Sequence, residues 1–265
     1  MTNKLIYTFH RAIADEFYRG VDKDIKIVAY IDSYKVSINN AIKLGYDCEL
    51  YCDAHTKQLF SGYKALKNLK INIIDIDIEG MFDNVKSYVY TKRDDDFILI
   101  DGDCFLMKRL PEIKSDVLVE THEPIYDIAY KDTVEYLNSI NVNKIVKEWV
   151  GNPRKTIVNT GLLYIKNKEI KDIYVKRCFD LQKYIMDKVN FSDYYDLNLK
   201  FHATCAQYLL SEIIDYYDLK CLSFESGTKP NTYYHLKGSD KFKLSDFTRY
   251  NLKEKTVLWE SIVYL

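Results

Sequence analysis

Two carboxylates, Asp101 and Asp103, follow a short apolar run in the stretch FILIDGDCF, residues 97–105 of the 265-residue chain. Burying one unpaired carboxylate costs free energy, and two neighbouring ones repel each other, so such a pair at a strand end usually holds a cation. Gly102 between them lets the backbone bend tightly. The pattern indicates a divalent metal site; the alternative is a strand-end turn with solvated carboxylates.

A second motif, His235-Leu-Lys-Gly238-Ser-Asp-Lys241, supplies what a site for a metal and a diphosphate needs. His235 offers an imidazole as a further ligand, Gly238 allows close backbone approach, and Lys241 neutralises phosphate. A lone histidine is more often structural, but this spacing together with an Asp-x-Asp favours the functional interpretation. Oxygen-rich ligation with one imidazole suits manganese or magnesium better than zinc.

The elements that must position these residues follow from the apolar pattern. Residues 97–100 are an uninterrupted apolar run, typical of a strand buried on both faces of a parallel sheet. Before it, strands are predicted at residues 4–9, 49–52 and 71–76, and helices at 25–44 (with Gly45 as its C-cap), 55–63 and 84–93. The alternation of strand and helix predicts a largely parallel sheet.

The second half of the chain is less regular. Strands are predicted at 117–120 and at 155–165, the latter broken by Asn159-Thr160-Gly161, and helices at 125–140, 168–189 and 203–217. No repeat, low-complexity tract or linker interrupts the sequence, so we expect a single domain.

Composition excludes several classes of function. The 38 Lys and Arg residues balance 39 Asp and Glu, which leaves no bulk charge to recruit nucleic acid or an anionic membrane. The six cysteines form no C-x-x-C pair and indicate reduced thiols in a cytoplasmic protein. The N-terminus has neither a signal peptide's apolar region nor a transmembrane segment. Oligomeric state is not encoded in any of these features.

The order of motifs resembles a known family. The chain has a basic residue, Lys86, on the helix before the Asp-x-Asp strand, then the Asp-x-Asp itself, an Asn-x-Gly at Asn159-Thr160-Gly161, Gln207 on a later helix, and the terminal His-x-x-Gly-x-x-Lys. In this order, from Lys4 to Lys241, the sequence is similar to the GT-A fold glycosyltransferases, above all retaining family 8 (glycogenin and galactosyltransferase-like enzymes) and related bacterial and viral sugar transferases.

This resemblance implies a GT-A, Rossmann-like α/β fold with a mostly parallel sheet flanked by helices. Residues 1–105 would form the nucleotide-binding half, 106–241 the acceptor half with the metal-completing motif, and 242–265 a C-terminal extension. The implied reaction is metal-dependent transfer of a sugar from a nucleotide-diphosphate sugar, a UDP-sugar by preference, to a glycan or other hydroxyl acceptor, with retention.

The resemblance also implies roles for individual residues. Asp101, Asp103 and His235 would bind Mn²⁺ or Mg²⁺. Lys86, Gly238 and Lys241 would contact the donor, and Gln207, with Asp103, would take part in catalysis beneath the anomeric carbon. A buried helical amide bonded to backbone is the alternative for Gln207. The chain departs from the family at Ala206, where an acidic residue is usual, and at Phe242-Lys243.

Position in the sequence suggests further candidates, each with a structural alternative. Thr8 and Phe9 end the first strand, where such sheets open a ligand crevice. Asp53 is predicted to hold base or ribose, or to cap a helix. Trp149 is predicted to stack on a sugar or to lie in the core. The acceptor candidates, for which a solvated turn is the alternative in the ETHE stretch, are Glu120, His122, Glu123, Asn159 and Gly161.

Three other functions remain open. A haloacid-dehalogenase-like phosphatase also carries Asp-x-Asp after an apolar strand, but has Thr or Val where this chain has Phe105 and places the motif near its N-terminus. An inactive GT-A module binding sugar or nucleotide is compatible with Ala206. A nucleotidyltransferase would need a glycine-rich phosphate loop after the first strand, and the sequence has none.

Overall fold

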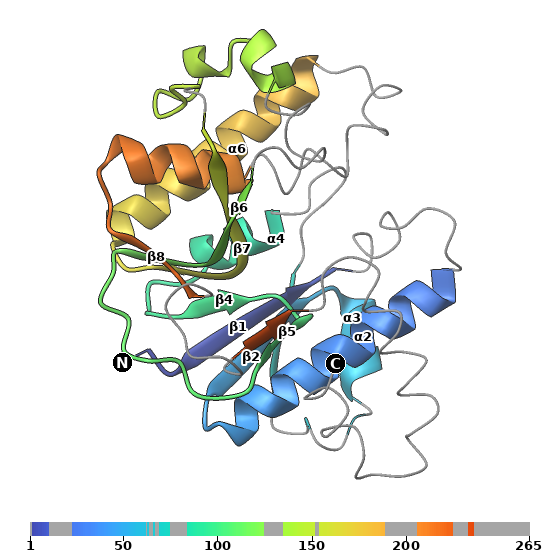
Figure 1. The fold of residues 1–265 in the computed structure, drawn as a ribbon. Coiled ribbons are helices and arrows are strands. Elements are labelled where there is room, and N and C mark those ends of the chain that lie inside the picture. The colour runs from blue at the N-terminus through green and yellow to red at the C-terminus, as the bar shows by residue number, and fades with distance from the viewer. Residues whose placement is uncertain are drawn as a thin grey trace.

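The computed structural model describes residues 2–10, 23–61, 63, 66, 69–74, 84–124, 135–151, 154–188, 206–224 and 233–235 (Figure 1). Its centre is a seven-stranded sheet in the order β3-β2-β1-β4-β7-β6-β8. These strands are β1 Lys4–Phe9, β2 Asp47–Cys52, β3 Lys70–Ile73, β4 Ile98–Ile100, β6 Val117–Pro124, β7 Thr156–Ile165 and β8 Cys221–Ser223. A separate two-stranded sheet pairs β5 Cys104–Leu106 with β9 Tyr233–His235.

The large sheet is mostly parallel, as predicted. β1 pairs in parallel with β2 and with β4, β2 with β3, and β6 with β8. Only β7, among the described strands of this sheet, runs against its neighbours β4 and β6. The carboxyl ends of β1, β2, β4 and β6 therefore meet at one edge of the sheet, where β7 begins.

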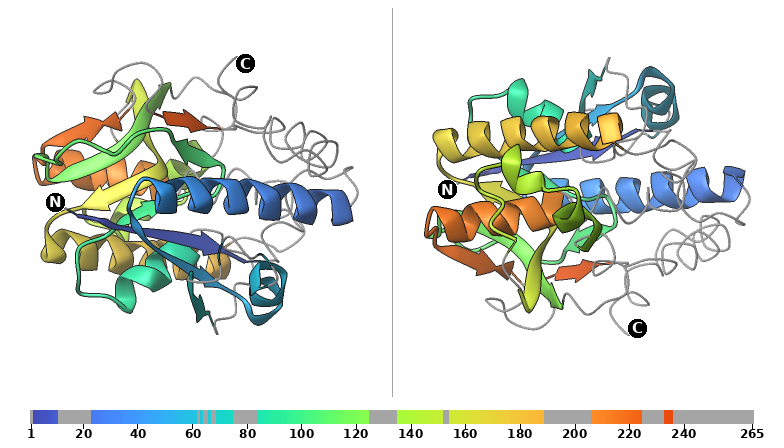
Figure 2. Two further views of the ribbon diagram at one scale, coloured as in Figure 1. Left: turned by 90° about the horizontal axis from the view of Figure 1, so that it is seen from below. Right: turned by 90° about the horizontal axis from the view of Figure 1, so that it is seen from above.

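Helices cover both faces of this sheet. They are α2 Lys23–Lys43, α3 Ala54–Ser61, α4 Asn84–Thr91 and α6 Lys168–Lys188, with a further helix over residues 206–216 and a short 3₁₀ turn, η2 Val142–Lys144. Figure 2 shows β1 between α2 on one side and α4 and α6 on the other. Two clusters of buried apolar residues follow: one joins the sheet to α4, α6 and residues 206–216, the other to α2, α3 and β5.

The end of α2 shows how sequence sets an element's boundary. Gly45 has a φ of +82°, the left-handed conformation that glycine adopts without steric cost. The Gly45 N–H donates to the Ile42 carbonyl, and the Tyr46 N–H donates to the Ala41 carbonyl. These two bonds form a Schellman motif, so the predicted C-cap is confirmed.

Three expectations need correction or fall outside the described residues. β7 is continuous through Asn159-Thr160-Gly161, and the predicted break is instead a register shift against β6, where Val119 pairs with Leu163 and Thr121 with Asn159. The ETHE stretch lies within strand β6 and is not a solvated turn. In the predicted helix 125–140, residues 125–134 are not described and 135–139 are helical.

Candidate functional site

The Asp-x-Asp forms a tight turn between β4 and β5. The Cys104 N–H donates to the Asp101 carbonyl at 3.1 Å, while the Asp101 N–H donates to the Gly161 carbonyl at 2.8 Å. Gly102 is required by a close approach: a Cβ there would lie 2.0 Å from the Tyr34 ring. The Tyr34 hydroxyl in turn donates to the Thr8 carbonyl at 2.6 Å, which ties the turn to the end of β1.

Pairing of β5 with β9 brings His235 to this turn. Cys104 and His235 are directly opposite in the register. His235 Nε2 lies 3.4 Å from Asp103 Oδ1, and His235 Nδ1 lies 2.6 Å from Glu120 Oε1. The structure therefore joins the two halves of the predicted motif, which are far apart in the sequence.

His235 and two neighbouring side chains form a group that could hold a metal ion. Ligand atoms of Asp103, Cys104 and His235 all lie within 4.8 Å of one another. A ligating histidine usually gives its other ring nitrogen to a carboxylate, which fixes its orientation, and Glu120 occupies that position for His235. Asp103 and His235 fit Mn²⁺ or Mg²⁺, whereas the Cys104 thiol, whose pKa burial raises to about 12, is a poor ligand for these hard ions. Sequence reasoning missed Cys104 as a member, although it directly follows Asp103.

The charges around His235 favour its protonated form when no cation is present. Burial lowers the pKa of His235, but the Cys104 thiol and hydrogen bonds with Asp103, Cys104 and Glu120 outweigh burial and raise the pKa above its usual value. A metal must displace this proton to bind.

Asp101 has a different partner from Asp103. Its Oδ1 forms an ion pair with Lys86 Nζ at 2.8 Å, and Lys86 Nζ also donates to the Thr160 carbonyl at 3.0 Å. Burial and the Asp103 carboxylate raise the pKa of Asp101, while Lys86 opposes that rise. The predicted basic residue on α4 thus lies at the Asp-x-Asp, and it contacts the first of the two carboxylates.

Three of the predicted acceptor residues form one hydrogen-bonded network beside this cluster, and a fourth, Glu120, lies against Gly161. Asn159 Nδ2 donates to Glu123 Oε1 at 2.9 Å, and Asn159 Oδ1 accepts from the Gly161 N–H at 2.8 Å. A Cβ on Gly161 would lie 2.1 Å from Glu120 Oε2. Glycine at this position therefore leaves the room that the Glu120 carboxylate occupies next to His235. His122, the fifth, lines a separate pocket described below.

Gln207 and Trp149 lie on the side of the sheet covered by helix 206–216. Gln207 is buried, and its Oε1 has no hydrogen-bond partner within the described part of the chain. Trp149 is a core residue: it is 2% exposed, packs 4.6 Å from the Tyr208 ring centroid, and donates to Asn138 Oδ1 at 3.0 Å. Of the two predicted roles for Trp149, the structure shows the core position.

The remaining donor candidates lie at the carboxyl ends of β1 and β2. Thr8 and Phe9 are buried, Phe9 against the Tyr34 ring. Asp53 caps α3: its Oδ1 accepts from the Thr56 N–H at 2.9 Å and its Oδ2 from the Thr56 hydroxyl at 2.6 Å. Nucleotide binding by these three residues stays a prediction.

Two predicted donor-binding residues lie outside the described residues, while the predictions on cysteines and on membrane spans can be compared with the described ones. The two residues outside are Gly238 and Lys241. The described cysteines, Cys48, Cys52, Cys104, Cys178 and Cys221, are all free thiols. Across the described segments, no helix combines the length and the apolar character that crossing a membrane requires.

Solved structures with a similar fold are transferases by name. The CTP:phosphocholine cytidylyltransferase of Streptococcus pneumoniae is 13% identical, with a TM-score of 0.50 over 93% of this chain and 99% of that one. The inositol-1-phosphate CTP transferase of T. maritima is 15% identical, with a TM-score of 0.50 over 97% and 98%. Mouse xyloside xylosyltransferase 1 is 9% identical, with a TM-score of 0.49 over 89% and 97%.

At these identities the likeness concerns the fold alone: an α/β domain with a mostly parallel central sheet flanked by helices. No protein-family model matches the sequence, and no curated protein matches it either. Any statement about the reaction must therefore come from the site.

Proposed function

We propose that this chain is a metal-dependent glycosyltransferase of the GT-A type, similar to family 8. It transfers a sugar from a nucleotide-diphosphate sugar, a UDP-sugar by preference, to a hydroxyl of a glycan or other acceptor, with retention. The observation that carries the proposal is the placement of His235 against Asp103, with Glu120 bonded to the opposite ring nitrogen. A buried carboxylate–histidine pair beside a second carboxylate is a common way to orient a metal ligand.

The residues of the site would divide the work as follows. Asp103 and His235, with Asp101, would hold Mn²⁺ or Mg²⁺, and a bound cation would supply positive charge to the diphosphate leaving group. Lys86 offsets the charge of Asp101 and contacts donor phosphate or sugar. The bond between the anomeric carbon and the diphosphate breaks, a bond to the acceptor oxygen forms, and the acceptor proton leaves with the diphosphate or to water.

Gln207 is proposed to lie beneath the anomeric carbon. Its buried Oε1, without a hydrogen-bond partner in the described part of the chain, supports this role, because a buried amide oxygen is costly unless a ligand satisfies it. Lys241 and Gly238 are proposed to complete the phosphate site, and Glu123 and Asn159 to face the acceptor.

The first test is donor binding by Asp103→Ala. Calorimetry with UDP- and GDP-sugars, with Mn²⁺ and with chelator, should show manganese-dependent binding in the wild type that Asp103→Ala loses by at least about 100-fold, because one of the few charged ligands is removed. Asp187→Ala, an exposed carboxylate on α6, is the matched control and should bind as the wild type does.

Donor hydrolysis measured on the same samples separates the alternatives. Donor binding without turnover would indicate that the chain is an inactive module that binds sugar or nucleotide, and not an enzyme. Unchanged donor binding and turnover in Asp103→Ala would contradict the metal role, and phosphate release from simple monoesters would favour the phosphatase.

A nucleotidyltransferase is the second candidate, because the two similar folds with a TM-score of 0.50 carry that name. Such an enzyme would release pyrophosphate when given CTP or UTP and a phosphorylated alcohol. A coupled pyrophosphate assay with sugar 1-phosphates and with phosphocholine distinguishes it from a glycosyltransferase, which releases the nucleoside diphosphate from the activated sugar.

A further inference from the structure

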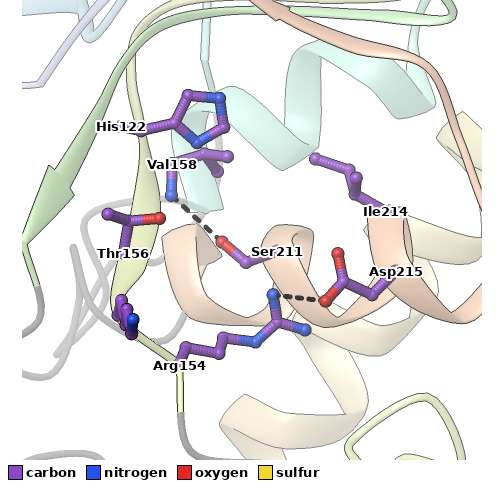
Figure 3. Close-up of a pocket in the computed structure, with 8 residues that line it drawn as sticks. His122, Arg154, Thr156, Val158, Ser211, Ile214 and Asp215 are labelled. Carbon is purple, nitrogen blue, oxygen red and sulfur yellow. Dashed lines mark hydrogen bonds and ion pairs between the residues drawn. The ribbon is translucent and has the colours of Figure 1, made fainter.

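A pocket lies between the β6–β7 end of the sheet and helix 206–216 (Figure 3). Its volume is about 310 Å³, at the small end of the range of ligand pockets. The lining combines polar side chains with two aliphatic ones, and its members are His122, Arg154, Lys155, Thr156, Val158, Ser211, Ile214 and Asp215.

The topology places this pocket at the same sheet edge as the Asp-x-Asp. His122 lies near the carboxyl end of β6, and Thr156 begins β7, while β4 ends at the same edge just before Asp101. Along β6, His122 is two residues beyond Glu120, which is about 7 Å of strand. The pocket and the Asp-x-Asp thus lie at the same end of the strands.

The positive charges at the pocket are offset by Asp215 in its wall and by Glu212, a buried carboxylate outside the lining. Arg154 Nε donates to the buried Glu212 Oε1 at 2.6 Å, and another Arg154 nitrogen lies 3.0 Å from Asp215 Oδ2 (Figure 3). The Arg154 guanidinium also lies 5.7 Å from the Tyr208 ring centroid. Glu212 and Asp215 thus offset the charges of Arg154 and Lys155, and burial lowers the pKa of His122.

Other groups on the wall remain available to a ligand. Within the segments the structure describes, the side chains of His122, Lys155 and Thr156 have no hydrogen bond or ion pair. The Ser211 hydroxyl is held in place, since it donates to the Gln207 carbonyl at 2.9 Å and accepts from the Val158 N–H at 3.0 Å. The pocket thus presents hydrogen-bonding groups around an apolar patch of Val158 and Ile214.

We propose that this pocket binds a neutral sugar residue of the acceptor, one or more units away from the hydroxyl that reacts. A sugar ring offers hydroxyls to the polar wall and C–H groups to the aliphatic patch, and a neutral ligand suits a pocket without excess charge. The inference rests on the proposed function, because it names the class of acceptor and assigns a subsite for it.

The test uses neutral monosaccharides as probes: glucose, galactose, xylose and N-acetylglucosamine, with glucuronic acid as the charged comparison. Binding is followed by saturation-transfer NMR and by the ring signals of His122. Thr156→Trp should abolish binding, because the exposed rim residue would fill the hollow without removing a core contact. Lys155→Ala should weaken it about 3- to 10-fold through loss of one donor. Lys144→Ala, an exposed lysine outside the pocket, is the control.

Each outcome decides the inference. Binding of a neutral sugar that Thr156→Trp loses and Lys144→Ala keeps supports the subsite. No binding by any neutral sugar, binding unaffected by Thr156→Trp, or preference for glucuronic acid would overturn it. Nucleotide-sugar binding is measured on the same samples, so a failure of the pocket with an intact donor site is distinguishable from a failure of the proposed function.

Discussion

Glu120 fixes the orientation of the His235 ring. The carboxylate is buried, and its Oε1 contacts Nδ1 at 2.6 Å, which leaves Nε2 directed toward Asp103. Replacing Glu120 by glutamine keeps an oxygen near His235 Nδ1 but removes the negative charge that favours this orientation of the ring. Glu120→Gln is therefore expected to weaken Mn²⁺ binding about 10- to 100-fold.

Electron paramagnetic resonance of free Mn²⁺ measures that affinity directly, and nitrogen NMR shifts of His235 report the change at the ring. Glu112→Gln, an exposed carboxylate, is the control. An affinity equal to that of the wild type, with the ring signals unchanged, would show that Glu120 only fills space.

Single residues were predictable from the sequence where their type and spacing carried the signal. Asp103 and His235 were identified in this way, and the structure brings them together. Glu120 was predicted only as an acceptor residue, because its contact with His235 depends on a register shift in β6 and β7 that local pattern does not encode. Cys104 was missed for a similar reason, since its neighbour across β5 and β9 is set by long-range pairing.

At the scale of elements, charged side chains hold the edge of the sheet where β1, β2 and the segment after α4 meet. Arg93 donates to Glu49 Oε2 at 2.8 Å and to Asp95 Oδ2 at 2.5 Å. Burial raises the pKa of Glu49. Lys70, Asn72 and Arg93 lower it by more than burial raises it, so the pKa lies below its usual value. The Arg93 hydrogen bond, the largest cause, lowers the pKa of Asp95.

A lowered carboxyl pKa contributes stability that is present above its unfolded value, near about 4, and is lost as pH falls through the folded value. Arg93→Ala should therefore lower the free energy of unfolding by about 2 to 3 kcal/mol at pH 7 and flatten its decline in acid. Urea unfolding at a series of pH values measures both. Lys92→Ala changes the exposed neighbouring residue and should show the same dependence of unfolding free energy on pH as the wild type. Equal slopes in acid for all three proteins would contradict the prediction.

Helices and the β-branched strands were predictable because their periodicity is local. The helix predicted at 25–44 is observed as Lys23–Lys43, and the one at 168–189 as Lys168–Lys188. β9, with three residues, has no period that a sequence pattern could reveal. β7 was predicted to break at Asn159-Thr160-Gly161, but pairing with both neighbouring strands keeps it continuous, so tertiary context overrides local preference.

At the scale of the whole molecule, the described residues are organised around the seven-stranded sheet, with a buried apolar cluster on each face. Because both clusters share the same strands, we expect the described core to unfold in one step. The chain has two tryptophans, so Trp259→Phe leaves Trp149 as the only one, in the cluster that includes α6. Its fluorescence and far-UV circular dichroism should give coincident urea transitions; separate midpoints would instead indicate independently folding units.

Completion of the His235 cluster has a consequence for the order of events during synthesis. Glu120 leaves the ribosome 115 residues before His235, its hydrogen-bond partner. A nascent chain that has already formed β1, β2 and β4 therefore lacks the imidazole, and β5 has no β9 to pair with. Since domains made from the N-terminus begin folding before release, the His235 cluster would be the last part of the described fold to form. A translation product that ends before His235 would then carry the large sheet without this cluster.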